Sequence, residues 1–121
     1  MKKMILTLIC AVVVLQGCRH KIAYKATLVE LMAKGCPHCE KIKPLIDEIR
    51  AEYNGLADVQ VYDVTTDEGQ EKSSIYGMKG TPTLIFLDEN GIEYFRLSQT
   101  IQKDVVEALL NTKTGGPAVK K

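Results

Sequence analysis

Gly35-Cys36-Pro37-His38-Cys39 places two thiols three positions apart at a predicted helix start. The thiolate is the form that attacks a disulfide, and a free cysteine with a pKa of about 8.5 is mostly protonated at neutral pH. The free N–H groups and the dipole of a helix N-terminus stabilise a thiolate at that position. Pro37 suits the first helical position, where a missing N–H costs nothing. We therefore predict that Cys36 attacks and that Cys39, one turn further along, resolves the mixed disulfide.

The N-terminal segment predicts export. Two lysines precede an apolar run over residues 4–15, which is typical of a secretory signal peptide and too short for a membrane span of about 20 residues. The following Leu-Gln-Gly-Cys ends at Cys18 and resembles the lipobox at which bacterial lipoproteins are cleaved and acylated. We predict a signal peptide over residues 1–17 and a lipidated tether over 18–25. The alternative is ordinary cleavage nearby, which would leave a soluble protein with a spare thiol.

Cysteine count and charge narrow the function classes. Cleavage before Cys18 would leave Cys36 and Cys39 as the free thiols, and loss of Lys2 and Lys3 would take the formal charge from +1 to −1. A single thiol pair does not make a disulfide-stapled scaffold, and the sequence lacks the basic excess of a nucleic-acid-binding protein. We expect a monomer with one compact domain.

Hydrophobic periodicity predicts alternating strands and helices in that domain, residues 26–112. The expected strands are 26–32, 59–64, 83–87 and 92–97, the last two joined by an Asn-Gly turn. The expected helices are 39–53, 67–76 with a cap at Thr66 or Asp67, and a last one capped by Thr100. From Thr112 onwards, and so throughout residues 113–121, we expect a disordered tail.

These residues resemble the thioredoxin family over Thr27 to about Leu110. Beyond the cysteine pair, the helical segment 39–53 has the spacing of the thioredoxin active-site helix, including the internal Pro44, and Tyr76-Gly-Met-Lys-Gly-Thr-Pro-Thr-Leu84 resembles the family's cis-proline segment. The resemblance implies an α/β thioredoxin fold with a central four-stranded mixed sheet flanked by helices. The first strand and helix of a full thioredoxin would be reduced or missing, because about eight residues separate Cys18 from the first strand.

The resemblance also implies roles for three further residues. Pro82 would follow a cis peptide bond and face Cys36, and the backbone of Thr81 would offer strand-like hydrogen bonds to a substrate chain. Glu30 lies six residues before Cys36, where thioredoxins have a buried acid. A carboxyl group in an apolar strand has a raised pKa and could accept the proton of Cys39. The alternative is a glutamate that reaches solvent at the sheet edge.

The dipeptide between the cysteines bears on the direction of electron flow. Pro37-His38 matches the pair found in strongly oxidising periplasmic oxidases, and His38 can place a positive charge or a hydrogen bond near Cys36. Those oxidases have a large helical insertion, however, whereas the interval from Cys39 to Pro82 is as long as in thioredoxin. Thr81 also differs from the valine typical of such oxidases, and it resembles the residue that precedes the cis-proline in several isomerases and reductases. The scaffold therefore favours a reductase, and a disulfide oxidase is the alternative.

The signal-peptide pattern and the lipobox predict an extracytoplasmic envelope protein anchored to a membrane by Cys18. Together with the thioredoxin resemblance, they imply that it acts on cysteine-containing proteins with a membrane redox partner. No small-molecule cofactor is implied beyond the Cys36–Cys39 disulfide. A zinc or copper(I) site that uses the cysteine pair is the alternative of another class, but a closed zinc site needs two more ligands, and His20 is the only other histidine besides His38. A haem attachment motif would need histidine directly after Cys39, where Glu40 stands.

Overall fold

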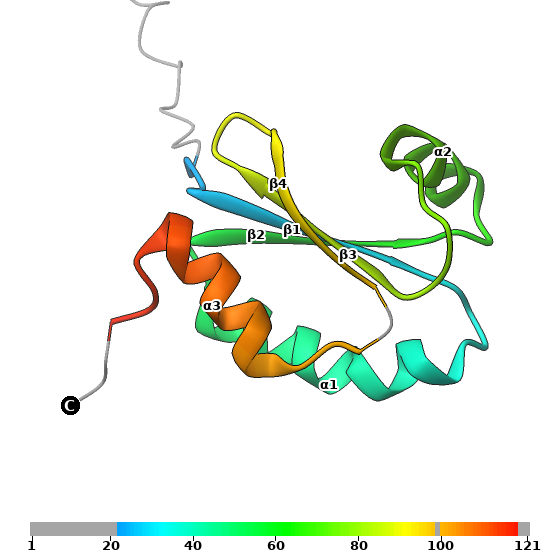
Figure 1. The fold of residues 1–121 in the computed structure, drawn as a ribbon, viewed down its shortest axis with the longest axis horizontal. Helices are drawn as coiled ribbons and strands as arrows, with labels where there is room; N and C mark the ends of the chain where they lie inside the picture. The colour runs from blue at the N-terminus through cyan, green and yellow to red at the C-terminus, as the bar shows by residue number, and fades with distance from the viewer. Residues whose placement is uncertain (1–21, 99, 119–121) are drawn as a thin grey trace, which may run out of the picture.

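A computed structural model describes residues 22–98 and 100–118 of the chain (Figure 1). The predicted signal peptide and the lipobox cysteine, Cys18, lie outside these residues. The described part contains four strands and three helices. In chain order they are β1 Ala26–Met32, α1 Pro37–Glu52, β2 Ala57–Asp63, α2 Asp67–Tyr76, β3 Thr83–Asp88, β4 Glu93–Ser98 and α3 Lys103–Thr114.

The four strands form one mixed sheet in the order β2-β1-β3-β4. β2 runs parallel to β1, whereas β3 is antiparallel to both β1 and β4. Helices α1 and α3 cover one face of the sheet and α2 covers the other (Figure 1). This arrangement confirms the predicted four-stranded thioredoxin fold without the first strand and helix of the full fold, within the residues that the structure describes.

The central strand β1 has the bounds that the sequence predicts, because it is apolar on both faces. Leu28 belongs to the core beneath α1 and α3, whereas Val29 and Leu31 belong to the core beneath α2. All three side chains are fully buried. Burial on both faces produces the continuous apolar run that identifies a central strand in a sequence. Glu30 lies on the same face as Leu28, because side chains alternate along a strand.

The start of α2 is fixed by one of the two predicted caps. The Thr66 hydroxyl accepts a hydrogen bond from the Gly69 N–H at 3.1 Å, so Thr66 rather than Asp67 is the cap. Gly77 ends the helix in the left-handed conformation with φ 63°, and the Met78 N–H donates to the Ser73 carbonyl at 3.0 Å. These bonds satisfy the last carbonyls of α2 where the chain turns toward the Lys79–Pro82 segment.

Both ends of α3 differ from the prediction. The capping position belongs to Gln102, which makes no side-chain capping bond, so Thr100 does not cap this helix. The helix also continues through Thr112 to Thr114 and ends at Gly115, whose φ is 76°. The interpretation of residues 112–114 as part of a disordered tail is therefore wrong. The glycine marks the helix end, as glycines commonly do, and the Thr114 hydroxyl donates to the Leu110 carbonyl inside the last turn.

Candidate functional site

The two cysteines lie at the start of α1, where the sequence places them. Cys36 occupies the N-cap position, and its Sγ accepts a hydrogen bond from the Cys39 N–H at 3.2 Å. Pro37 follows in the first helical turn, as predicted. The two sulfurs form a disulfide, with a Cα–Cα distance of 5.2 Å. A backbone N–H therefore points at the Cys36 sulfur, which is the arrangement that stabilises a thiolate after the disulfide is reduced.

The fold makes the two sulfurs unequal in exposure. Cys36 is half-buried, whereas Cys39 is only 2% exposed. The neighbouring Pro37 and His38 are exposed. A substrate disulfide can therefore approach Cys36 from solvent, while Cys39 can be reached only from within the site.

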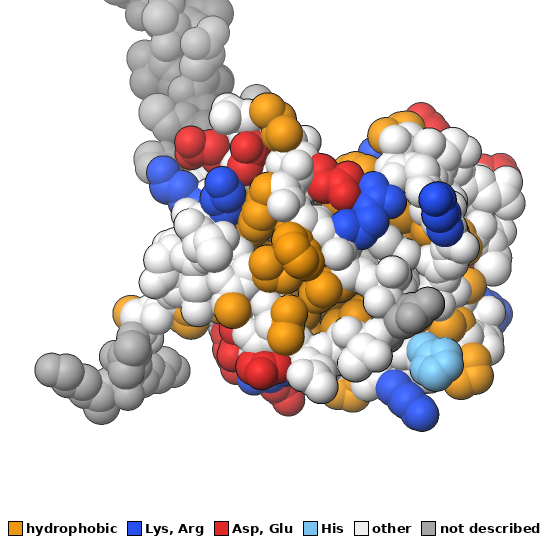
Figure 2. Space-filling view, viewed as in Figure 1, with side chains coloured by type: hydrophobic (Ala, Val, Ile, Leu, Met, Phe, Trp, Pro, Cys, Tyr) orange, Lys and Arg blue, Asp and Glu red, His pale blue; other side chains and the backbone are white. Residues whose placement is uncertain are grey.

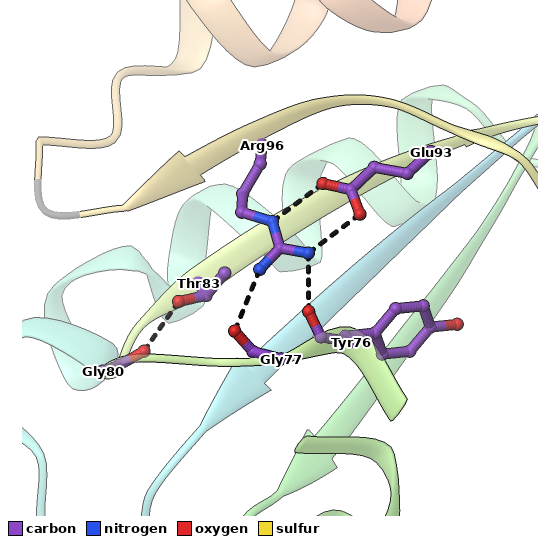
Figure 3. Close-up of polar contacts among 6 residues, drawn as sticks. All are labelled: Tyr76, Gly77, Gly80, Thr83, Glu93 and Arg96. Carbon is purple, nitrogen blue, oxygen red and sulfur yellow. Dashed lines mark hydrogen bonds and ion pairs between the residues drawn. The ribbon is translucent and has the colours of Figure 1, made fainter. Parts of the chain in front are cut away.

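The Thr81–Pro82 segment faces the first cysteine across the site. The peptide bond before Pro82 is cis, which confirms that prediction, and Pro82 itself is buried. The Sγ of Cys36 lies 4.0 Å from the Thr81 carbonyl oxygen. Two segments that are 45 residues apart in the chain thus meet at the reactive sulfur. The Thr83 hydroxyl donates to the Gly80 carbonyl at 2.6 Å and fixes the turn from this segment into β3 (Figure 3).

Glu30 lies in the interior and not at a sheet edge, since β1 is a central strand that pairs with both β2 and β3. Its side chain is 4% exposed. Burial raises its pKa to about 7, with a smaller opposing effect from the positive charge of Arg50. Glu30 and Cys39 line the same cavity of about 170 Å³ under α1. The cavity brings the two groups together in a space large enough for water.

Arg96 on β4 is a residue of this region that sequence analysis missed. Its guanidinium donates to the Tyr76 carbonyl at 2.6 Å and to the Gly77 carbonyl at 3.4 Å, while Glu93 accepts two further bonds at 2.8 Å each (Figure 3). The planar fork of arginine suits this bidentate contact. Arg96 thus ties the edge strand to the end of α2, from which the Thr81–Pro82 segment follows. The Glu-x-x-Arg spacing in β4 carries no signal for this contact, because the carbonyls lie twenty residues earlier.

Metal binding by the cysteine pair would need further ligands close to it. Within residues 22–98 and 100–118, no three His, Cys, Asp or Glu side chains are grouped to hold a metal ion. In the same part of the chain, no helix has both the length and the apolar character needed to cross a bilayer.

Comparison with known proteins agrees with this geometry. The family model for thioredoxin matches residues 12–112. The chain belongs to the thioredoxin family. It is 30% identical over 84 residues to thioredoxin of Pseudomonas aeruginosa, which covers 69% of this chain and 75% of that protein. A mutant thioredoxin from Halobacterium salinarum superposes with a TM-score of 0.65 at 27% identity, covering 75% of this chain and 76% of that one.

The chain is also similar to larger proteins of the family. It is 29% identical over 91 residues to a protein disulfide-isomerase of Schizosaccharomyces pombe, a match that covers 75% of this chain. It spans only a quarter of the length of that isomerase, against three quarters of the Pseudomonas thioredoxin. These relatives and the Cys36–Cys39 disulfide identify a site for thiol–disulfide oxidoreductase chemistry.

Proposed function

We propose that this protein exchanges disulfides with cysteine-containing proteins outside the cytoplasm, with Cys36 as the attacking thiol and Cys39 as the resolving thiol. The observation that carries the proposal is the unequal placement of the two sulfurs. Cys36 is half-buried at the N-cap of α1 and receives an N–H bond, whereas Cys39 is 2% exposed. A low pKa and access to substrate are the two properties that an attacking cysteine needs.

The exchange proceeds in two displacements. The Cys36 thiolate bonds to one sulfur of the substrate disulfide, and the other sulfur leaves with the electron pair and is protonated. The Cys39 thiolate then bonds to Cys36, and the second substrate sulfur leaves in the same way. Two electrons pass to the substrate and the protein ends as the disulfide. The dithiol itself carries these electrons, so the reaction needs no further cofactor.

In this cycle Glu30 accepts the proton of Cys39. The support is its burial beside Cys39 in the same cavity and its pKa of about 7, at which a carboxylate can both take up and release a proton near neutral pH. The test is the rate at which the mixed disulfide resolves, followed as a function of pH. In the wild type this rate rises as Glu30 loses its proton near pH 7, and in Glu30→Gln that rise is absent. An unchanged profile in the variant would remove Glu30 from the proton path.

Thr81 and Pro82 position the substrate chain in this proposal. The carbonyl of Thr81 lies 4.0 Å from the Cys36 sulfur, so an extended segment that bonds to the Thr81 backbone brings its own sulfur to Cys36. A substrate bound in this way is recognised through its backbone, and its neighbouring side chains fall on either side of the segment.

For the direction of electron flow we propose a reductase, with a disulfide oxidase as the alternative that Pro37 and His38 favour. The interval between α1 and β3 holds only β2 and α2, without an inserted helical domain. The decisive measurement is equilibration of the Cys36–Cys39 pair in glutathione or dithiothreitol buffers. A potential near about −270 mV supports the reductase, and one near about −120 mV overturns it in favour of the oxidase.

We further propose that Cys18 is acylated and anchors the protein to a membrane of the bacterial envelope, where a membrane redox partner restores its dithiol. The support is the basic start, the apolar run and the Leu-Gln-Gly-Cys motif of the sequence. Mass spectrometry of the mature protein is expected to find Cys18 as the first residue, carrying the mass of a lipid. A mature N-terminus elsewhere, or an unmodified Cys18, would overturn the anchor without affecting the redox proposal.

A further inference from the structure

Two open clefts flank the Thr81–Pro82 segment, one on each side. The first, of about 510 Å³, runs from the end of α2 to β4 and contains Lys79 and Arg96. The second, of about 530 Å³, lies between α1 and the chain before α3 and contains His38 and Lys41. Both include Thr81 and Pro82, so they form one surface that is interrupted by the segment facing Cys36.

The charged side chains that line these clefts all carry basic groups. No aspartate or glutamate lines either cleft among the described residues. The second cleft is also lined by the apolar side chains of Ile42, Ile101 and Pro82. Figure 2 shows the histidine (pale blue) exposed on this face with Lys or Arg side chains (blue) near it. The second cleft therefore combines apolar side chains with basic ones, and the first adds Lys79 and Arg96 on the other side of the Thr81–Pro82 segment.

Neither Lys41 nor Lys79 has a carboxylate partner among residues 22–98 and 100–118, unlike Lys25, Lys43 and Lys103. Lys34, Lys72 and Lys113 also lack one in this part of the chain, but they line neither cleft. Lys43 pairs with Asp47 at 3.0 Å, and Lys103 pairs with Glu48 at 2.7 Å. The sequence explains the difference for Lys41, because Pro37 and Leu45 occupy the positions four residues away on the helix, where ion pairs form. The charge of Arg96, in contrast, is already engaged by Glu93.

We infer that this surface selects substrate proteins whose reactive cysteine lies in an extended segment with carboxylates on both sides of it. The inference rests on the proposed function, since it names the substrate class of the same site. A segment paired with the Thr81 backbone advances about 3.3 Å per residue, so residues one to three positions from its cysteine reach the two clefts. Carboxylates there meet Lys79 on one side and Lys41 on the other.

The charge preference also has a kinetic consequence. An acidic segment is repelled by the Cys36 thiolate, so without neighbouring cations it would react more slowly than a neutral one. Lys41 and Lys79 reverse this order by attracting the segment before the sulfurs meet. The preference should weaken with salt, since exposed charges are screened over about 10 Å at 0.1 M ionic strength.

The test uses three peptides with one cysteine held as a mixed disulfide with 2-thiopyridine and flanked on both sides by Glu, Gln or Lys. Attack by the reduced protein joins Cys36 to the peptide sulfur and releases pyridine-2-thione, whose absorbance gives the rate. Each rate is divided by the rate of the same peptide with 2-mercaptoethanol, a neutral thiol, to remove the peptide's own reactivity. The wild type is expected to prefer Glu over Gln and Gln over Lys.

The variants locate the preference. Lys41→Gln and Lys79→Gln should each lower the ratio of the Glu to the Gln rate by about two- to five-fold, as expected for exposed ion pairs. Lys25→Gln is the matched control, because it removes the same charge at the opposite end of β1, where Lys25 faces Glu89 at 3.7 Å. It should keep the wild-type ratio.

Three results would count against the inference, and they are distinguishable. A Glu to Gln ratio of one or below in the wild type overturns it while the redox proposal stands. An equal fall in Lys25→Gln and Lys41→Gln overturns it too, because net charge would then explain the preference. If the reduced protein releases pyridine-2-thione from none of the three peptides faster than solvent does, the proposed function itself is overturned, and this inference with it.

Discussion

The two faces of the sheet carry cores of different size, and the site uses residues from both. We call the face beneath α1 and α3 the deeper face and the face beneath α2 the thinner face. Beneath α1 and α3 the described structure has a core of eleven buried residues, whereas the core beneath α2 has four. The dithiol and Glu30 belong to the first face. The Thr81–Pro82 segment follows α2 and reaches Cys36 from the second, where Arg96 fastens the helix end.

This difference separates the tasks of the site. The face beneath α1 and α3, with its larger core, buries Cys39 and the Glu30 carboxyl, and burial is what raises the pKa of Glu30. The thinner face only has to hold a backbone segment in place, and it does so with a few directed contacts. Substitutions on the first face should therefore alter chemistry and pH dependence, and those on the second should alter position and local stability.

The largest effect is expected from the cysteines. Cys36→Ser should abolish insulin reduction, because no nucleophile remains at the accessible position. Cys39→Ser should still attack but should accumulate mixed disulfides, because the resolving thiol is gone. Non-reducing gels and mass spectrometry distinguish the two outcomes. Mixed disulfides forming through Cys39 in Cys36→Ser at the rate seen in Cys39→Ser would contradict the unequal roles.

Glu30 should give the next largest effect, on stability. Its pKa is about 7 in the folded protein and 4.5 ordinarily, so the folded state keeps a proton that the unfolded chain releases between these values. The resulting stabilisation is fully present below about pH 4.5 and is lost as the pH rises through about 7. Glu30→Gln, which does not ionise, should gain up to about 3 kcal/mol relative to wild type between pH 4.5 and pH 8.

Urea unfolding of the oxidised proteins at several pH values measures this gain. The control is Glu71→Gln on α2, where the carboxylate is exposed, and it should leave the pH dependence of unfolding unchanged. A pH dependence equal in wild type and Glu30→Gln would mean that Glu30 is charged in the folded protein, and that the deeper face does not shift its pKa.

On the thinner face, Gly69 tests how closely α2 is held. A methyl group at this position would collide with the Asp63 carbonyl at the end of β2, so Gly69→Ala should destabilise the protein by about 1–3 kcal/mol. Ser74→Ala on the exposed side of α2 is the control and should have little effect. Unfolding by urea measures both variants. Equal stability of the two would show that α2 can shift outward without cost.

The smallest effect is expected from Arg96. Arg96→Lys keeps the charge but loses the two-pronged contact with the α2 end, and should cost about 1 kcal/mol. Its specific signature is faster hydrogen exchange at the Gly77 and Met78 amides, which donate within the end of α2. Exchange in the centre of β1 should stay as in the wild type. Uniform acceleration would assign Arg96 to global stability and not to positioning of this turn.

Local sequence patterns predict the position of an element best where they are unambiguous. β1 could be placed to the residue because both of its faces are apolar, and the disulfide pair could be placed because Pro37 and the spacing of the cysteines specify a helix start. The ends of α3 differ from the prediction because the local sequence signals there are absent or misleading. Gln102 makes no capping bond that a sequence could reveal, and Gly115 is followed by a second glycine and a proline, which indicate a tail.

The sequence by itself determined the chemistry of this protein: two thiols one turn apart, a helix start to hold a thiolate and a proline segment of the thioredoxin type. Only the tertiary structure decided which sulfur is sheltered, that Glu30 and Cys39 line one cavity, and that Arg96 holds the end of α2. The physical reason is the distance along the chain over which each effect acts. Helix caps and hydrophobic periods act over a few residues, whereas burial, cavities and pKa shifts depend on strands and helices that meet only when the sheet forms.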